Sequence, residues 1–155
     1  MKKILILLAL VTILFISSGQ TYEQQSLIST LQNMFPDKPF ESLLALLKIP
    51  YWGHTISVEE RGYYQFVEFL LRKAAHFFLF GFVALAFYAV LPKWRGRWFI
   101  ALVWTFILAT VDEYHQSVTG GRTPSGQDVF LDMCGAVVFL SALVFMKRIF
   151  GRRSE

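Results

Sequence analysis

Residues 74–91 read AAHFFLFGFVALAFYAVL, a run that is apolar and aromatic apart from His76. A helix needs about 20 residues, with roughly 17 as the lower limit, to cross the hydrocarbon core of a bilayer. The run therefore predicts a membrane-spanning helix. Hydrophobic residues make up 55% of the whole chain and aromatic residues 17%, which is more than a soluble domain with one core requires. We interpret residues 1–155 as a single membrane domain.

Three further apolar stretches lie at about residues 4–19, 98–116 and 128–146. The last is long enough to cross a bilayer as a helix, whereas the other two are short. The apolar part of stretch 98–116 ends at residue 111. The stretch therefore reaches a sufficient length only when Asp112, Glu113 and Gln116 continue the helix at the membrane boundary. The sequence therefore predicts an all-α fold, an integral membrane four-helix bundle.

The orientation of the spans follows from the basic residues in short loops, which collect on the cytoplasmic side of a membrane. Both termini are then cytoplasmic (N-in, C-in), and a segment at about residues 20–72 is extracytoplasmic. The chain is thus expected to be a multi-pass protein of the cell membrane. The basic residues beside the apolar stretches are Lys2, Lys3, Lys93, Arg95, Arg97, Lys147, Arg148, Arg152 and Arg153.

The first apolar stretch has a second interpretation. A Lys-rich start, an apolar core over residues 4–16 and the small residues that follow it also fit a secretory signal with cleavage near Gly19. Cleavage would leave three spans.

The extracytoplasmic segment has a mixed polar composition. Residues 22–35 and 39–49 carry apolar side chains at spacings of three and four, which predicts amphipathic helices at the membrane surface. Residues 49–56 read as a loop that places Tyr51 and Trp52 near the interface. The spacing of Ser57 and Glu60 is that of a capping box, which predicts a helix running through Arg72 into the second span without a break.

The polar residues at the predicted outer ends of the spans are the candidate site. Because spacings of three and four place side chains on one helix face, each helix presents its polar residues together at one membrane level. Gly135 lies one turn deeper than the last of them and allows close helix contact. The candidates are Lys73, His76, Asp112, Glu113, Gln116, Arg122, Asp128 and Asp132.

Ionisable groups at bilayer depth are disfavoured, by roughly 2.5–3.5 kcal/mol at the centre on insertion scales, so they normally face the protein interior and pair. Asp132 lies about one turn inside the fourth apolar stretch, and its available cationic partners are Lys73, His76 and Arg122. We therefore expect a polar pocket. The alternative is a purely structural polar cluster, in which His76 is a packing residue.

Several polar residues near the site have ordinary structural explanations. Thr123 before Pro124, or Ser125 with Asp128, would cap the fourth helix. Gly120 and Gly121 are turn residues, His115 is expected at the wet interface, and His54 in a loop carries no signal.

Composition and motifs also exclude several classes of function. The net charge of +4 comes from short basic clusters beside apolar stretches, so we expect no nucleic-acid partner. The single Cys134 permits no internal disulfide and no cysteine-based zinc site. The spacing of His76, Asp112, Glu113 and Asp128 is not diagnostic of a metal, so we predict neither metal nor cofactor. The oligomeric state is left open.

Three blocks of sequence together resemble the VanZ-like family of membrane proteins. They are RKAAHFF (72–78), DEYHQ (112–116) and GGRTPSGQDVFLDMCGA (120–136), and the family's pattern is KxxH, DExxQ, GR, then Asp with Asn or Asp four residues later and a Gly. FISSGQ (15–20) resembles the end of the family's first span, which implies that this span is retained. Asp132 stands where many members carry Asn.

The resemblance implies a theme more than a reaction, because the family is named for a protein associated with low-level teicoplanin resistance. Our first hypothesis is a binder of a membrane lipid or lipid-linked cell-wall precursor. In it Lys73, Arg122 and His76 hold a phosphate or carboxylate. Asp112, Glu113 and Gln116 orient those cations or accept sugar hydroxyls. The second is an intramembrane hydrolase or transferase with His76 as general acid or base, oriented by Glu113 or Asp112, and water or Ser125 attacking.

Overall fold

The computed structural model describes residues 1–51, 53–119 and 125–151. The expectations for Trp52, Gly120, Gly121, Arg122, Thr123 and Pro124 therefore lie outside the described residues, as do the bases Arg152 and Arg153. The described residues are helical apart from turns and one two-stranded hairpin. The elements in chain order are α1 (Lys2–Ser18), α2 (Ile28–Met34), α3 (Glu41–Leu44), β1 (Ile49–Tyr51), β2 (His54–Ile56), α4 (Val58–Arg61), α5 (Tyr63–Val90), α6 (Arg97–Thr119) and α7 (Gly126–Gly151).

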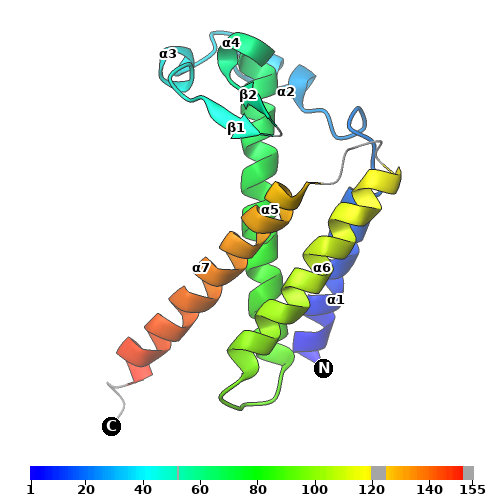
Figure 1. Ribbon diagram of the computed structural model, residues 1–155, viewed down its shortest axis with the longest axis vertical. Helices are drawn as coiled ribbons and strands as arrows, with labels where there is room; N and C mark the ends of the chain where they lie inside the picture. The colour runs from blue at the N-terminus through cyan, green and yellow to red at the C-terminus, as the bar shows by residue number, and fades with distance from the viewer. Residues whose placement is uncertain (52, 120–124, 152–155) are drawn as a thin grey trace.

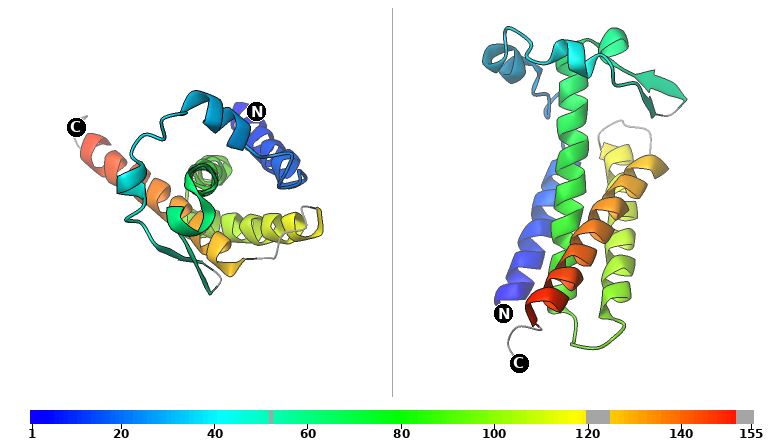
Figure 2. Two further views of the ribbon diagram at one scale, coloured as in Figure 1. Left: turned by 90° about the horizontal axis from the view of Figure 1, so that it is seen from above. Right: turned by 90° about the vertical axis from the view of Figure 1, so that its left-hand side faces the viewer.

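The long helix α5 is the centre of the molecule, and α1, α6 and α7 pack around it (Figure 1). Seen from above, the three helices surround α5 on different sides (Figure 2). Small side chains let the helices approach each other: Ala84, Ala101 and Ala136 are fully buried in one core cluster, and Ala109 in another. The start of α1 and the last turn of α7 lie at the end of the bundle opposite the segment that carries α2 to α4 (Figure 1).

Two helices, α5 and α7, are long and apolar enough to cross a membrane within the described residues. Large apolar side chains are exposed on the outer faces of all four long helices, among them Phe15, Phe82, Phe106 and Phe145. Faces of this kind suit contact with lipid, so the chain is a membrane protein. Helices α1 and α6 correspond to the predicted first and third spans.

The backbones of α5 and α7 approach each other closely at Gly135. A Cβ atom at Gly135 would overlap the carbonyl oxygen of Phe77 and would lie 2.9 Å from its carbonyl carbon. Only glycine fits without a shift of one helix, as the sequence predicted for this position. The contact lies one turn below Asp132, so it holds the polar ends of α5 and α7 together.

The segment between α1 and α5 differs from its prediction in three respects. The amphipathic helices α2 and α3 are short. Between them Lys38 and Phe40 adopt left-handed conformations, with φ 47° and 61°, which no continuous helix can contain. Residues 49–56 form a hairpin instead of a loop, with Tyr51 paired to His54. Its Ile56 is buried against Phe66 of α5.

The third difference concerns the helix expected to run unbroken from Ser57 into the second span. The amide of Glu60 does donate to Ser57 Oγ at 3.3 Å, as the capping box predicted. The prediction of continuity was wrong, because Gly62 has φ 83° and ψ 159° and separates α4 from α5. The break turns α4 and the hairpin beside it across the end of α5 (Figure 2). Tyr51 of the hairpin then contacts Lys73 of α5 and Asp128 of α7.

Candidate functional site

A cavity of about 550 Å³ lies where the hairpin meets the ends of α5, α6 and α7. The volume falls within the range of roughly 300–1,000 Å³ that is usual for small-molecule sites. Its wall is mixed in charge, with cations from α5 and acids from α6 and α7. The lining residues that carry the argument are Tyr51, Arg72, Lys73, His76, Glu113 and Asp128.

Lys73 is held at the cavity wall by two oxygen atoms from other elements. Its Nζ lies 2.5 Å from Asp128 Oδ1 and donates to the hydroxyl of Tyr51 at 3.0 Å. Tyr51 in turn donates to the carboxylate of Asp128, at 2.9 and 3.0 Å to its two oxygens. The hairpin, α5 and α7 are therefore joined at one point, and Lys73 pairs with Asp128 instead of Asp132.

His76 and Asp132 meet one turn deeper, between α5 and α7. His76 Nδ1 lies 3.5 Å from Asp132 Oδ1, and Asp132 is 2% exposed. These two atoms are buried and lack a hydrogen-bond partner among the described residues. Of the cations considered for Asp132, the structure places His76 beside it, while Lys73 pairs with Asp128 and Arg122 lies outside the described residues.

The two acids of α6 accept hydrogen bonds, one from within α6 and one from the residue before α7. Asp112 Oδ2 accepts from Gln116 Nε2 at 2.7 Å, on the shared face that the spacing predicted. Glu113 Oε1 accepts from the amide of Ser125 at 2.6 Å, immediately before α7 begins. The hydroxyl of Ser125 accepts from the amide of Asp128 at 3.3 Å, so the predicted Ser125 cap is present. In a capping box the Asp128 carboxylate would accept from the amide of Ser125, but here Glu113 accepts from that amide instead.

His115 is not the wet, interfacial residue that its position in the sequence indicated. Its Nδ1 lies 2.9 Å from Ser18 Oγ, and its ring stacks on Phe15 at a centroid distance of 4.2 Å. Thr119 Oγ1 donates to the carbonyl of Ser18 at 3.0 Å. These contacts join the end of α1 to the end of α6.

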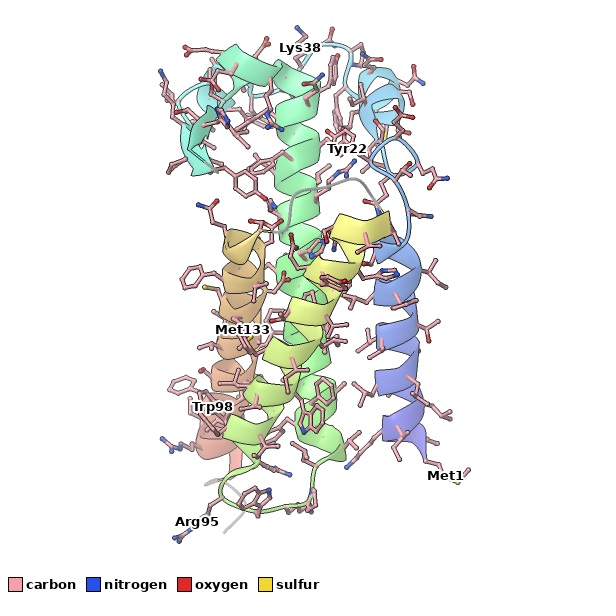
Figure 3. All side chains as sticks on the ribbon, turned by 45° about the vertical axis from the view of Figure 1, so that its right-hand side comes forward. Met1, Tyr22, Lys38, Arg95, Trp98 and Met133 are labelled. Carbon is pink, nitrogen blue, oxygen red and sulfur yellow. The ribbon has the colours of Figure 1, made fainter. Side chains whose placement is uncertain are left out.

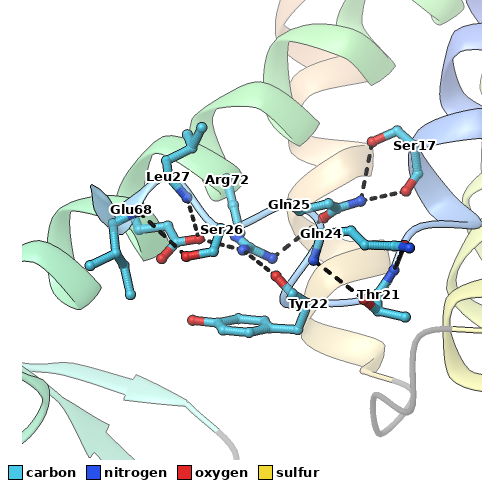
Figure 4. A network of polar contacts seen from close by, with 10 residues as sticks. Ser17, Thr21, Tyr22, Gln24, Gln25, Ser26, Leu27, Glu68 and Arg72 are labelled. Carbon is cyan, nitrogen blue, oxygen red and sulfur yellow. Dashed lines mark hydrogen bonds and ion pairs between the residues drawn. The ribbon is translucent and has the colours of Figure 1, made fainter. Parts of the chain in front are cut away.

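A second polar network at the cavity rim was missed by the sequence reasoning (Figure 4). Glu68 is fully buried in α5, where its carboxylate accepts from Arg72 one turn later and from the amide of Leu27 at 3.2 Å. Arg72 also donates to Gln25 and lies 4.2 Å over the ring of Tyr22. The network joins the chain after α1 to α5. The signal that could have found it is the spacing of four between Glu68 and Arg72.

The structure thus brings most of the candidate residues to one place. Lys73, His76, Glu113, Gln116 and Asp128 line the cavity, while Asp112 and Asp132 lie behind it in contact with Gln116 and His76. Arg122 lies outside the described residues. Ser125 is 1% exposed and its hydroxyl caps α7, so it is not a nucleophile poised in the cavity. No group of three metal-ligating side chains forms within the described ranges.

The comparisons with known proteins agree with the motif blocks. A family model described as VanZ/LLP1 matches residues 3–147, which include all the described candidate residues. Searches of curated proteins and of solved structures gave no significant match.

Proposed function

The chain belongs to the VanZ/LLP1 family, and from that premise we propose that its cavity binds the anionic group of a membrane lipid or lipid-linked cell-wall precursor. The proposal includes a four-span, N-in and C-in arrangement in the cell membrane, with the cavity open to the exterior. The observation that carries it is the position of Lys73 of α5, a cation fixed at a cavity wall by Tyr51 of the hairpin and Asp128 of α7.

Lys73 retains capacity for a ligand. An ammonium group has three N–H donors, and Asp128 and Tyr51 take two of them. Lys73 Nζ also lies 5.3 Å from the ring centroid of Phe69, but no third hydrogen-bond acceptor for it is present among the residues that the structure describes. Arg72 adds a second cation on the same wall, positioned by Glu68 and Tyr22. A phosphate or carboxylate placed between Lys73 and Arg72 would receive charge-assisted hydrogen bonds from both.

The size and place of the cavity favour the head of a lipid over a whole lipid. A volume of about 550 Å³ accommodates a phosphate with a sugar-sized group. The cavity meets the polar ends of helices whose exposed faces are apolar, so the lipid tail can stay in the membrane. Gln116 and Glu113, on the opposite wall, offer groups for sugar hydroxyls. By holding such a precursor in its cavity, the protein would contribute to glycopeptide resistance, including teicoplanin resistance.

An intramembrane hydrolase or transferase is the second candidate. The observation that favours it is the contact between His76 and the buried Asp132, an arrangement in which a carboxylate can orient an imidazole. Water would be the attacking group, because Ser125 is buried in its capping role. In the third candidate the same contacts serve only to hold the bundle together.

Lipid extraction tests the proposal. The wild-type protein, Lys73→Gln and Lys48→Gln are purified in mild detergent, and co-purified lipids are identified by mass spectrometry. Lys48 is a matched control, because its ion pair with Glu59 lies on the surface, with 61% and 65% of the two side chains exposed. We expect an anionic or lipid-linked glycan species with the wild type and Lys48→Gln, and its loss with Lys73→Gln at equal protein abundance.

Two further outcomes separate the candidates. Turnover of the extracted lipid that disappears in His76→Gln would support the enzyme. Equal lipid content in all three proteins, with teicoplanin susceptibility unchanged by Lys73→Gln in an expressing host, would contradict the binding proposal.

A further inference from the structure

A second and larger cavity lies at the opposite end of the bundle. It has a volume of about 1110 Å³ and is bounded by the end of α5, the turn after it, the start of α6 and the last turns of α7. Figure 1 shows α7 leaning away from α6 toward its C-terminal end, and side chains from both helices line the space between them. None of the site residues discussed above contributes to this cavity.

The charged residues among the described lining of this cavity are all basic. Four bases line it: Lys93 and Arg95 from the turn after α5, Arg97 from the start of α6, and Arg148 from the end of α7. Figure 3 places Arg95 at the end of the molecule opposite Tyr22 and Lys38. The chain contains no Asp or Glu in residues 1–22, 69–111 or 133–154, so the sequence supplies no acid near these bases. Glu155 lies outside the described residues.

Two cations share one aromatic ring at the cavity wall. The guanidinium of Arg97 lies 3.9 Å from the ring centroid of Tyr88 and donates to its hydroxyl at 2.8 Å. Lys147 Nζ lies 4.7 Å from the same ring. Like charges held this close repel, and within the described part of the chain no carboxylate offsets them. The orientation of the spans requires bases on this side of the membrane. It does not require that these bases line a cavity.

We infer that this cavity binds the phosphate of an anionic phospholipid from the leaflet on its own side of the membrane. Basic pockets between membrane helices take anionic head groups in this way. The apolar part of the wall, with Trp98, Val144 and Phe145, suits the first segment of the acyl chains. A free phosphate ion would share the basic contacts but would leave most of the volume empty. The inference goes beyond the proposed function, and only the assignment of the leaflet depends on the proposed topology.

Native mass spectrometry of the delipidated protein tests the inference, with phosphatidylglycerol, phosphatidylcholine and inorganic phosphate as probes. The test variant is Lys93→Gln/Arg148→Gln, and the matched control is Lys2→Gln/Lys3→Gln, which removes the same charge from α1 at the same end. We expect phosphatidylglycerol to bind the wild type and the control more tightly than phosphatidylcholine. The test variant should lose about 30-fold in affinity for phosphatidylglycerol, because two basic contacts are removed.

Misfolding is separated from loss of contacts by the charge-conserving variant Lys93→Arg/Arg148→Lys, which should keep most of the affinity. In a Lys73→Gln background the substitutions Lys93→Gln/Arg148→Gln should cause the same loss of phosphatidylglycerol affinity, so failure of the proposed site at Lys73 leaves this result intact. Equal binding of the two lipids, equal losses in the test variant and the control, or displacement of the lipid by equimolar inorganic phosphate would overturn the inference.

Discussion

Replacing Gly135 by alanine should force α5 and α7 apart. The added Cβ would lie 2.9 Å from the carbonyl carbon of Phe77 and 3.2 Å from its Cα, and closer still to the carbonyl oxygen. Favourable carbon–carbon contacts are about 3.5–4.0 Å, so the helix axes must separate by roughly half an ångström to 1 Å. Because the obstacle is backbone, no side-chain rotation relieves it.

The expected net destabilisation is about 2 kcal/mol. Overpacking typically costs about 1–3 kcal/mol, and a clash with backbone belongs at the upper end of that range. Alanine recovers about 1 kcal/mol through its higher helix propensity. The separation should also lengthen the 3.5 Å contact between His76 and Asp132, one turn away, and weaken ligand binding at the outer cavity.

The free energy of unfolding in mixed micelles, measured by SDS titration, tests this prediction. The control is Gly126→Ala, also in α7, where an added Cβ meets no atom within 4 Å. We expect Gly126→Ala to be as stable as the wild type or slightly more stable, and Gly135→Ala to be less stable than either. If the two variants unfold at the same SDS fraction, the close contact of α5 and α7 is not as described here.

Two other predictions concern the polar contacts. Tyr51→Phe removes hydrogen bonds to Asp128 and Lys73, so the hairpin should open more easily by about 1.5–3 kcal/mol in local free energy. Hydrogen exchange of the hairpin amides measures this, and Tyr64→Phe, which removes a hydrogen bond to the carbonyl of Phe35 outside the hairpin, should not reproduce it. Glu68→Leu leaves Arg72 without its buried partner and should destabilise the protein by about 3–5 kcal/mol in SDS titration. Adding Arg72→Met should recover most of the loss, and no recovery would mean that the charge pair is not the cause.

The helical architecture and the convergence of polar residues could be predicted from the sequence, because both depend on local periodicity. The length of apolar runs indicates helices, and spacings of three and four indicate shared faces, as for Asp112 and Gln116. The small residue at Gly135 predicted a close approach. Family membership followed from ordered blocks of residues that no single motif would have identified.

The partners of individual side chains could not be predicted in the same way. Asp128 meets Lys73 because the break at Gly62 and the hairpin bring Tyr51 over the ends of α5 and α7. The fold of that segment depends on backbone conformations that leave little trace in hydrophobic periodicity. Likewise, His115 seemed solvated on α6 alone, and its contact with Ser18 exists only because α1 packs beside it.

The central claim is that the polar cavity opens to the cell exterior, and cysteine labelling tests it most directly. Single cysteines are introduced as His54→Cys in the exposed hairpin and Arg95→Cys in the exposed turn at the other end, each in a Cys134→Ala background. Intact cells are then treated with a membrane-impermeant maleimide. The account predicts labelling at position 54 in intact cells and labelling at position 95 only after permeabilisation. The reverse pattern would contradict it.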